Sequence, residues 1–561
     1  MLNRPISTTT MAITRHSIQL DKREQQLRDL LVDVAKSIDA TGKAKEPLVL
    51  RWAGGWVRDK LLGLESHDID IAINSMTGEP FVQYMCDFCT QPDVIQRHGI
   101  GAADIGNLHK VKSNPDKSKH LETAMIPIFG LEVDVVNLRK ESYAEDSRNP
   151  TIEFGTAEED ALRRDATINA MFYNLHTQEV EDFTTGLQDL QDHVIRTPLD
   201  PLQTFRDDPL RVLRLVRFSS RLSFPIDAGT QKYMTDQSVL EALKIKISRE
   251  RVGIELEKMF KGMHSRTTQK ETGLNTNSAS QDKHPRLALE IIDKLGLYSA
   301  IFTDPAKPDL EVPDTSRWSV AYNGLDDIIQ NDSPGSLGEL LVRADDAKFT
   351  AWNLIAVSPW TSVEDAPGTK KKPMTSPPVR VIAREGFKAS NKLTDIMAAC
   401  HYNREEILQL KNAVINKEPY INERDKFGMA IRRWDERKTN WRLQVVSTML
   451  IEAMGRLQEW PSTVPQGRVD EKAVKQREDF VQEWQAFMDH LSELDVMEAP
   501  SLKPLVDGRV LSEALGVKSG RWTGPALNVC VAWQLRNPKE TDPQGAIDEV
   551  KSRKEELKIT G

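Results

Sequence analysis

A pair of glycines followed by two closely spaced aspartates constrains this chain more than any other feature. A short helical pattern, 56–62, follows Gly54 and Gly55, and then Asp68 and Asp70 open a β-prone run. Adjacent glycines let backbone N–H groups approach a phosphate, and the start of the next helix adds partial positive charge. Side chains at i and i+2 of a strand share one face, so the two aspartates present their carboxylates together. That geometry suits two Mg²⁺ ions about 3.5–4 Å apart, which hold a triphosphate and activate a hydroxyl for in-line attack.

Either half of this pattern alone is weak, because most Gly-Gly pairs are simple turns and most Asp-x-Asp pairs lie at solvated loop edges. Together, in this order and about a dozen residues apart, the two halves are specific. The stretch resembles the catalytic signature of the DNA polymerase beta-like nucleotidyltransferase superfamily. More narrowly, it resembles the class II branch, which holds CCA-adding tRNA nucleotidyltransferases and bacterial poly(A) polymerases. The resemblance implies that Asp68 and Asp70 bind Mg²⁺, that Gly54, Gly55 and Arg58 hold the triphosphate, and that Asp59 also belongs to the nucleotide site.

A third carboxylate is expected on a later strand. Asp134 stands between two valines in the β-prone run 131–138, and a buried aspartate is costly unless it meets a cation or hydrogen-bond donors. The resembled family carries an acidic residue on this strand five positions before an arginine, and Arg139 stands five after Asp134. We therefore take Asp134 as the third catalytic carboxylate. Glu132 has the same facing and is the alternative.

A second motif lies in the run 158–174, which we expect to begin as a helix. It contains Arg163, Arg164, Asp165 and Asn169. Arginines in a helix usually face solvent, but the block matches the family's Arg-Arg-Asp motif residue for residue. The resemblance implies that these side chains contact phosphate and ribose. The preceding segment, 143–154, resembles the family's connector motif.

A third motif opens a helical region after residue 205. Arg211, Arg214 and Arg217 recur every third residue, which alone indicates an amphipathic helix with a solvated basic stripe. Family members carry Glu-Asp-x-x-Arg here, and this chain has an aspartate in place of the glutamate, followed by Asp208 and Arg211. The resemblance makes Asp208 and Arg211 the base-reading pair, on one helical face. Arg214 and Arg217 would then meet phosphates or position that pair.

Elementary chemistry explains how such a pair selects bases. A carboxylate only accepts hydrogen bonds, and a guanidinium only donates them. Cytosine and adenine each present an amino donor beside a ring-nitrogen acceptor, whereas uracil and guanine present the reverse. One aspartate beside one arginine therefore accepts C and A and rejects U and G without a nucleic-acid template.

The fold class that follows is α+β, with a small mixed β-sheet nucleotidyltransferase head followed by an elongated all-α neck, body and tail. The predicted divisions are a presequence or disordered tail (1–20), the catalytic head (21–187), a helical neck with base recognition (188–261), a disordered insertion (262–284), a helical body (285–500) and a tRNA-binding tail (501–561). The tail carries Lys503, Lys518 and Arg521 among glycine-rich turns, which can dock a phosphate backbone. The resembled family binds the tRNA elbow with a similar element. A helical contact within the protein is the alternative.

Composition limits the partners and the compartment. The net charge of −9 excludes a generally basic nucleic-acid binder, so any RNA contact needs a local basic surface. No run approaches 18 apolar residues, so no membrane contact is expected. Four cysteines in this length indicate a reducing compartment, and the pair Cys86 and Cys89 is expected to be core or surface rather than a Zn site. Residues 1–20 contain no acidic residue, which is typical of a weak mitochondrial presequence or of a disordered tail, and Met11 offers a second start.

The expected function is addition of C, C and A to tRNA 3′ ends from CTP and ATP, with Mg²⁺ as cofactor and release of pyrophosphate. The tRNA would be held at its acceptor stem and elbow by a monomer located in the mitochondrion and in the cytoplasm or nucleus. A poly(A) polymerase and an enzyme adding only CC or only A are the alternatives within this chemistry. The segment 99–119, interpreted as a mobile loop, argues against CC-only addition. A catalytically dead tRNA-binding scaffold is the alternative from another class, and contact of Lys370 to Lys372 with RNA is a weaker possibility.

Overall fold

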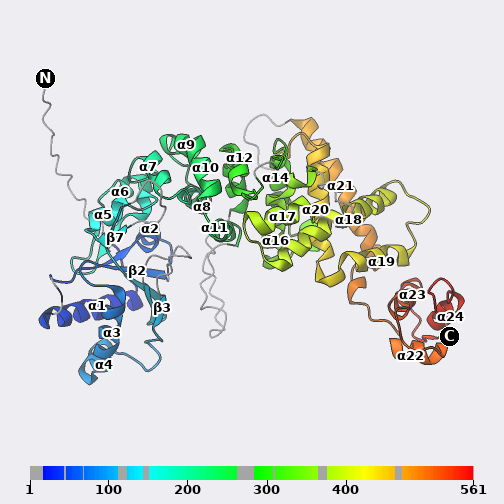
Figure 1. Ribbon diagram of the computed structural model, residues 1–561, viewed down its shortest axis with the longest axis horizontal. Coiled ribbons are helices and arrows are strands. Elements are labelled where there is room, and N and C mark those ends of the chain that lie inside the picture. Colours follow the sequence, from blue (N-terminus) through cyan, green and yellow to red (C-terminus); the bar gives the residue numbers. More distant parts are fainter. Residues whose placement is uncertain are drawn as a thin grey trace. The chain divides into compact units, whose positions relative to one another are not determined.

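The computed structural model of the chain describes residues 17–559 apart from 43, 45, 67, 112–122, 143–150, 262–283, 308–309, 364–375 and 462–469 (Figure 1). Four predictions lie wholly or largely outside these residues, namely the presequence 1–20, the connector 143–154, the insertion 262–284 and the lysine run 370–372. Of the predicted loop 99–119, residues 112–119 lie outside as well, and its described part ends in a short strand, His109–Val111. The chain divides into two compact units, residues 1–284 and 285–561. The finer division into six segments stays a prediction.

The first unit is built around a sheet of seven strands in the order β3-β4-β5-β2-β1-β8-β9. Its strands are β1 (Leu50–Ala53), β2 (Asp68–Ile73), β3 (His109–Val111), β4 (Thr123–Ile128), β5 (Leu131–Asn137), β8 (Phe172–Asn174) and β9 (Glu179–Glu181). β2 and β5 are parallel and the other neighbouring pairs are antiparallel, so the sheet is mixed. β6 (Arg139–Ser142) and β7 (Thr151–Phe154) form a separate two-stranded sheet.

The sequence pattern also predicts an apolar face on a first helix, a hairpin around Gly130 and two closing strands after residue 171, and the structure confirms all three. β4 and β5 form the hairpin expected around Gly130, whose φ of 74° lies in the region that favours glycine. The closing strands expected near 172–175 and 179–183 are present as β8 and β9. In α1 (Lys22–Ala40) the predicted apolar face is fully buried, and it consists of Leu27, Leu30, Leu31, Val34 and Ile38.

The alternation of side chains along β2 gives the sheet two different faces. Ile69 and Ile71 are fully buried on one face, whereas Asp68 and Asp70 point to the other. α1 and α3 (Gly78–Phe88) cover the isoleucine face, because α3 contacts β4 and β5 and α1 contacts β1 and α3 (Figure 1). α3 starts so close to the sheet that a Cβ on Gly78 would lie 2.3 Å from the Val135 carbonyl oxygen.

Small residues hold the opposite face against α5 (Ala157–Leu162). The cluster consists of Ala53, Ala72, Leu138, Ala157, Ala161, Ala170 and Phe172. Alanines bring the helix close to the sheet beside the aspartates of β2. The segment that follows α5 is thereby placed next to them.

The other elements of the first unit are helices. They are α2 (Gly55–Leu61), α4 (Pro92–His98), the 3-10 turn η2 (Thr167–Asn169), α6 (Gly186–Gln191), α7 (Pro201–Asp207), α8 (Arg211–Leu222), α9 (Ala228–Met234), α10 (Gln237–Ile245) and α11 (Arg249–Lys261). The expected run 158–174 is therefore not one helix. α5 ends at Leu162, and the Arg-Arg-Asp motif lies in the turn between α5 and η2.

The described part of the second unit is built from helices and contains no strand. Its α-helices are α12 (Pro285–Lys294), α13 (Tyr298–Ile301), α14 (Trp318–Gln330), α15 (Leu337–Leu341), α16 (Asp345–Ala356), α17 (Pro378–Val381), α18 (Asn391–Ile415), α19 (Arg424–Trp434), α20 (Trp441–Arg456), α21 (Glu471–Glu493), α22 (Gly508–Leu515), α23 (Thr523–Arg536) and α24 (Gln544–Ser552). The α+β class, a mixed sheet followed by a helical remainder, is confirmed. The helical pattern of this region also predicts that its tryptophans are core residues rather than base-stacking platforms. The structure agrees, because four of them are buried, namely Trp434, Trp441, Trp460 and Trp484.

Candidate active site

Four carboxylates share one face of the parallel pair β2 and β5. Asp68 lies opposite Glu132 in the register, and Asp70 lies opposite Asp134. Aligned residues of paired strands project from the same face, so all four stand on the face opposite the buried isoleucines. The structure thus brings together the predicted group Asp68, Asp70 and Asp134. Asp134 is the neighbour of Asp70, and the alternative, Glu132, is the neighbour of Asp68.

This crowding raises the pKa values of the carboxyl groups. Desolvation and then the charge of Asp68 raise the pKa of Asp70 to about 6. Desolvation, followed by the charges of Asp70, Asp68 and Glu132, raises the pKa of Asp134 to about 7. The pKa of Asp68 is raised by desolvation and by Glu132. Asp68 and Asp70 still keep solvent access, so a cation can reach the like charges and stabilise them.

The donor set fits Mg²⁺, a hard cation that prefers carboxylate and water oxygens. Among the residues that the structure describes, no three acidic, histidine or cysteine side chains already form a complete ligand set. Mg²⁺ does not need such a cage, because it is commonly held by one or two carboxylates together with substrate phosphates and water. Asp68 and Asp70 are the candidate ligands, and Asp134 stands beside them.

The glycine turn lies directly beside these carboxylates. Gly54 has φ of 70°, and its N–H donates to the Met171 carbonyl oxygen at 3.2 Å. A Cβ at Gly54 would lie 2.9 Å from Nη1 of Arg164 and 3.8 Å from Oδ2 of Asp70. Gly55 begins α2. Backbone without a side chain therefore separates Arg164 from Asp70, and this opening is where a phosphate could approach both.

Arg58 and Asp59, predicted to serve the nucleotide, are buried and face inward. Arg58 donates from Nη1 to Oδ1 of Asn169 at 2.5 Å and from Nε to Oδ1 of Asp59 at 2.8 Å. The other carboxylate oxygen of Asp59 lies 3.5 Å from Nη2 of Arg221. In this arrangement Arg58 joins α2 to η2 by fixing Asn169, and its Nη2 stays beside the glycine turn, 3.6 Å from where a Cβ on Gly55 would lie.

One carboxylate that the sequence did not single out organises the Arg-Arg-Asp motif. Asp160 on α5 is buried and accepts from Nη2 of Arg163 at 2.5 Å and from Nε and Nη2 of Arg164 at 3.1 and 3.0 Å. Arg164 also donates to the Asn169 carbonyl oxygen at 3.0 Å and lies over the Phe172 ring at 5.1 Å. Asp160 thereby aims Arg164 at the glycine turn, whereas Arg163 also pairs with Glu141 at 3.2 Å and braces β6.

The third residue of that motif reaches into the helical part of the unit. Asp165 pairs with Arg214 of α8, and the charge of Arg214, with Arg211 and Arg217 farther off, outweighs desolvation and lowers the pKa of Asp165 to about 2. Nε of Arg217 donates to Oε2 of Glu255 at 2.7 Å, and Nη1 of Arg214 lies 3.9 Å from Oε1 of Glu255. Arg214 and Arg217 are thus bound to protein acids and not presented as a free basic stripe.

Asp208 and Arg211 lie at the start of α8, where the pair was predicted, but Asp208 precedes the helix: its Oδ1 accepts from the Leu210 N–H at 3.1 Å and its carbonyl oxygen from the Arg211 N–H at 3.0 Å. Asp208 caps α7 with extended backbone, φ −141° and ψ 99°, and α8 begins only at Arg211. Pro209 explains this, because a proline disfavours helical backbone at the preceding residue. Asp208 accepts from Nη2 of Arg251 at 2.7 Å, whereas Nη2 of Arg211 donates to the Arg163 carbonyl oxygen at 2.8 Å. The two side chains lie near each other in sequence but have different partners.

Arg251 and Glu255, which the sequence does not single out as site residues, lie in the run 248–256. The charged pairs of this run predict that they brace the helices and do no chemistry. They do so, since they bind Arg217 and Asp208. Asp160 and Arg221 do not lie in any motif that the sequence singles out. Asp160 precedes Arg164 by one helical turn, and this spacing was the only available indication.

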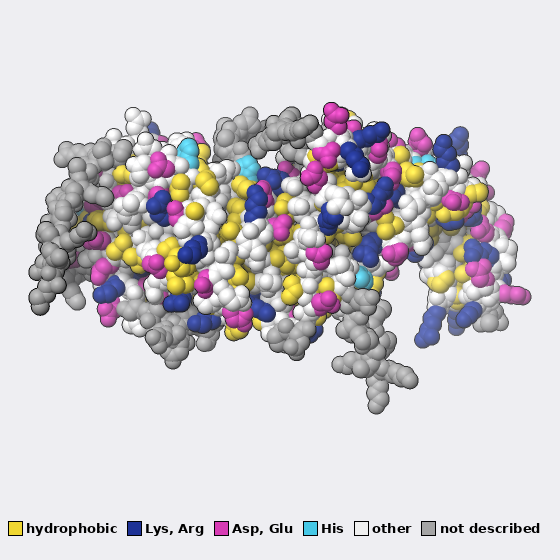
Figure 2. Space-filling view, turned by 90° about the horizontal axis from the view of Figure 1, so that it is seen from above, with side chains coloured by type: hydrophobic (Ala, Val, Ile, Leu, Met, Phe, Trp, Pro, Cys, Tyr) yellow, Lys and Arg dark blue, Asp and Glu magenta, His cyan; other side chains and the backbone are white. Residues whose placement is uncertain are grey.

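In the tail, two of the predicted tRNA contacts lie on one exposed turn. Lys518 and Arg521 are exposed between α22 and α23, and the turn is held by Trp522, whose Nε1 donates to the Lys518 carbonyl oxygen at 3.0 Å. Lys503 is exposed too, and its carbonyl oxygen accepts from Nε2 of Gln534 at 3.1 Å. Figure 2 shows Lys and Arg side chains scattered among acidic ones over the visible face, so a basic surface is local, as the acidic composition requires.

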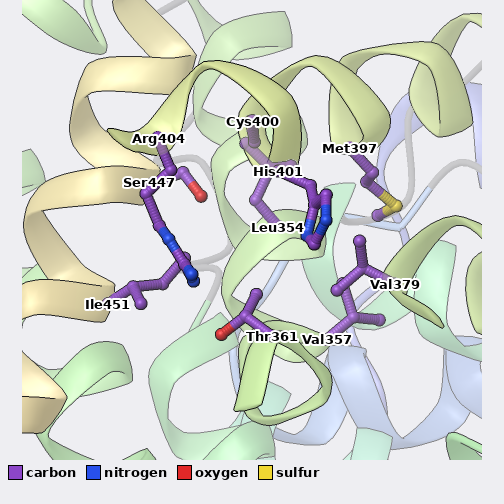
Figure 3. A pocket seen from close by; sticks show the side chains of 10 residues that line it. All are labelled: Leu354, Val357, Thr361, Val379, Met397, Cys400, His401, Arg404, Ser447 and Ile451. Atoms are coloured by element: carbon purple, nitrogen blue, oxygen red, sulfur yellow. The ribbon is translucent and has the colours of Figure 1, made fainter. Parts of the chain in front are cut away.

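A separate hollow lies inside the second unit, between α16, α18 and α20 (Figure 3). The ring of His401 points into it, beside Leu354, Val357 and Val379. The cavity measures about 10 Å³, which is room for about one water molecule. A nucleotide does not fit there, and the hollow is not part of the candidate active site.

The chain was compared with known proteins. Residues 50–196 match the family described as Poly A polymerase head domain. A nucleotidyltransferase, lcsQ, of Purpureocillium lilacinum is 59% identical and covers 97% of this chain and 93% of its own. The mitochondrial CCA tRNA nucleotidyltransferase of Saccharomyces cerevisiae is 36% identical, with 96% and 94% covered.

Solved structures agree on the fold. A CCA-adding enzyme in complex with ATP has a TM-score of 0.58 at 18% identity, with 97% of this chain and 96% of that chain covered. The Thermotoga maritima CCA-adding enzyme complexed with tRNA has a TM-score of 0.55 at 17% identity, with 97% and 99% covered. In the described segments, none of the helices has an apolar stretch long enough to span a bilayer.

Proposed function

Since the chain belongs to the family of CCA-adding tRNA nucleotidyltransferases, we propose that it adds C, C and A to tRNA 3′ ends from CTP and ATP and releases pyrophosphate. The observation that carries the proposal is the carboxylate face, where Asp70 stands opposite Asp134 and beside Asp68. An intact set of three carboxylates disfavours the dead scaffold. The family relationship and the site thus point to the same chemistry.

Asp68 and Asp70 would hold Mg²⁺, with Asp134 beside them, and the bound ions supply charge neutralisation and an acidified 3′-hydroxyl. The tRNA 3′-hydroxyl gives its proton to water and its oxygen attacks the α-phosphorus in line. The bond from that phosphorus to the oxygen bridging to the β-phosphate breaks, and pyrophosphate leaves. Gly54 leaves the space through which the phosphates reach Asp70 and Arg164. Arg58 holds Asn169, and Asp160 holds Arg164, so these residues keep the phosphate-facing groups in place.

For base choice, we keep Asp208 and Arg211 as the proposed readers, with Arg214 and Arg217 as their support. This role requires both side chains to exchange their present hydrogen-bond partners. Arg211 must exchange the carbonyl oxygens of Thr204 and Arg163 for a base, and Asp208 must turn from Arg251 towards an amino group. Both side chains sit beside Asp165 and Arg214, which connect them to the Arg-Arg-Asp motif.

Lys518, Arg521 and Lys503 are proposed to dock the tRNA backbone, which fits their exposure on glycine-rich turns. The relatives named as mitochondrial, together with the acid-free first 20 residues, support a mitochondrial location. A second product starting at Met11 would serve the cytoplasm and nucleus. Fluorescent fusions beginning at Met1 or Met11 test this part, and chromatography with light scattering tests the proposed monomer.

The deciding experiment incubates purified protein with tRNAs lacking A, CA or CCA, together with each nucleoside triphosphate alone and with all four. The expected products gain at most three nucleotides, with C added before A. A long run of A from ATP alone identifies a poly(A) polymerase. Extension that stops after CC, or that requires a CC end, identifies a partial enzyme, and no extension by any mixture contradicts the proposal.

A further inference from the structure

One face of α11 carries three charged residues spaced by one helical turn. Arg251, Glu255 and Lys258 stand four and three positions apart, so they share a face. α8 and α11 pack together (Figure 1). On this face Arg251 binds Asp208 at 2.7 Å and Glu255 binds Arg217 at 2.7 Å. The first two members of the face are therefore bound to the neighbouring elements.

Lys258 continues this face towards the carboxylate site. Its side chain is exposed, and it makes no hydrogen bond or ion pair with a described residue, yet its charge interacts with that of Asp68. Partial removal from water lowers the pKa of Lys258, Arg217 and Arg214 add to that shift, and Glu255 and Asp68 oppose it. Lys258 therefore lies one turn beyond Glu255 on the face of α11 that packs on α8, within electrostatic range of Asp68 and without an ion pair to it.

The other cations around the site are already occupied. Arg164 is bound to Asp160, Arg214 to Asp165, Arg217 to Glu255 and Arg58 to Asp59. A nucleoside triphosphate brings several negative charges to a face that already holds Asp68, Asp70 and Asp134. Lysine is a compact point charge and a common phosphate ligand. Unlike these arginines, Lys258 is a described cation near Asp68 that makes no ion pair with a described residue, so its whole charge is available to a phosphate.

We infer that Lys258 contacts the terminal phosphates of the incoming nucleoside triphosphate and stabilises the pyrophosphate as it leaves. The inference rests on the proposed function. As the bond from the 3′-oxygen to the α-phosphorus forms, the bond from that phosphorus to the bridging oxygen breaks, and its electron pair passes to pyrophosphate. Lys258 neutralises this negative charge through its N–H groups and transfers no proton. The residue thereby joins the base-reading helices to the triphosphate end of the same substrate.

The test is equilibrium binding of ATP, ADP and AMP in the presence of Mg²⁺ and without tRNA, for wild type, Lys258→Met and Lys258→Arg. Methionine keeps the length of the side chain and removes its charge. We expect Lys258→Met to weaken ATP binding on the order of tenfold or more, ADP binding by less, and AMP binding hardly at all. Lys258→Arg should recover most of the loss. Lys261→Ala is the matched control, because it removes a positive charge one turn further along α11, where Lys261 lies near Glu257.

Unchanged AMP binding also shows that the variant is folded. Equal weakening of all three nucleotides, or no weakening of any, overturns the assignment of Lys258. A different result contradicts the proposed function, namely that the wild-type protein extends no truncated tRNA. If the wild type extends tRNA and Lys258→Met binds ATP as tightly as the wild type, only the inference on Lys258 is lost.

Discussion

Asp70 and Asp134 lie directly opposite each other on the parallel strands β2 and β5, and each raises the cost of ionising the other. This relationship supports Asp134 as the proposed third carboxylate, whereas Glu132 stands opposite Asp68 nearer the beginning of both strands. A cation is the simplest way to stabilise both charges. The first two predictions follow from it.

Replacing the carboxylates one at a time separates their roles. Asp68→Ala, Asp70→Ala and Asp134→Ala should each reduce incorporation of both C and A by about a thousandfold or more, since each removes a charge from the metal face. Binding of tRNA should stay within about twofold, because the loss is not on the RNA surface. Glu132→Ala is the control and should keep most activity. Near-normal turnover of Asp134→Ala, with strong loss in Glu132→Ala, would exchange the two assignments.

The raised pKa values predict how stability depends on pH in the absence of metal. The pKa values of Asp70 and Asp134 rise from 3.8 to about 6 and about 7 on folding. Between about pH 4 and 7 the folded protein then binds more protons than the unfolded chain, so stability falls as pH rises through this window. In EDTA, Asp134→Asn should raise the Tm at pH 8 on the order of 2 °C and leave it unchanged near pH 4.

Magnesium provides the matching control for that measurement. Adding Mg²⁺ at pH 8 should raise the Tm of the wild type more than that of Asp134→Asn, because the ion binds the charges that repel each other. A Tm that is equal for the two proteins at every pH contradicts the coupling between Asp70 and Asp134. If the difference in Tm between Asp134→Asn and the wild type is the same with and without Mg²⁺, these acids do not form a metal site.

The glycine turn offers a comparison with a built-in control. Gly54 and Gly63 both have positive φ, 70° and 74°, so an alanine at either position carries backbone strain on the order of 1–3 kcal/mol. The strain at Gly54 lies at the upper end, because its ψ of −125° is outside the left-handed region that other residues can adopt. At Gly63 an added Cβ meets nothing within 4 Å, whereas at Gly54 it lies 2.9 Å from Arg164. Gly54→Ala should therefore lower kcat/KM for CTP and ATP at least tenfold beyond any effect of Gly63→Ala. Equal effects of the two substitutions would reduce the role of Gly54 to a turn.

The exposed cations of the tail predict that charge reversal there affects full-length tRNA more than a minihelix. Lys518→Glu with Arg521→Glu should weaken tRNA binding and flatten its salt dependence, since each lost phosphate contact lowers the log–log slope by about 0.7–0.9. Nucleotide incorporation onto a tRNA minihelix, which lacks the elbow, should change much less. Lys551→Glu is the control, because it reverses a charge in the same tail on a residue paired with Asp548. Equal loss on tRNA and minihelix argues against elbow binding.

How far the sequence determined the site depends on the range of the interactions. The carboxylate face could be predicted because alternation along β2 leaves no choice once the isoleucines are buried. The fate of Arg58 could not, because its partner Asn169 is 111 residues away in sequence. The same holds for Arg217, whose partner Glu255 is 38 residues away. Local patterns show that an arginine is present, but only the packed chain shows which acid binds it.

The position of Asp208 differs from these cases, because a local rule of the sequence indicates it. Pro209 follows it directly, and the restriction that a proline places on the preceding residue already argues against a helical Asp208. A proline also suits the first turn of a helix, which places Asp208 just before it, where Oδ1 accepts from the Leu210 N–H at 3.1 Å. The structure shows α7 ending and α8 beginning on either side of this dipeptide.

The last prediction concerns base choice, for which the two proposed readers now have known partners. Asp208 is bound by Arg251, and Arg211 by the carbonyl oxygens of Thr204 and Arg163. If they read the base after exchanging these partners, Asp208→Ala should raise the relative use of UTP and GTP, because the carboxylate that repels their carbonyl oxygen is gone. Arg211→Ala should lose discrimination more than triphosphate binding, at about 1–3 kcal/mol per lost pair. The measurement is kcat/KM for CTP, ATP, UTP and GTP, with Arg251→Ala as the comparison, since it releases Asp208 without removing either reader. If both reader variants lose activity uniformly and keep the preference for C and A, Asp208 and Arg211 are structural and another pair reads the base.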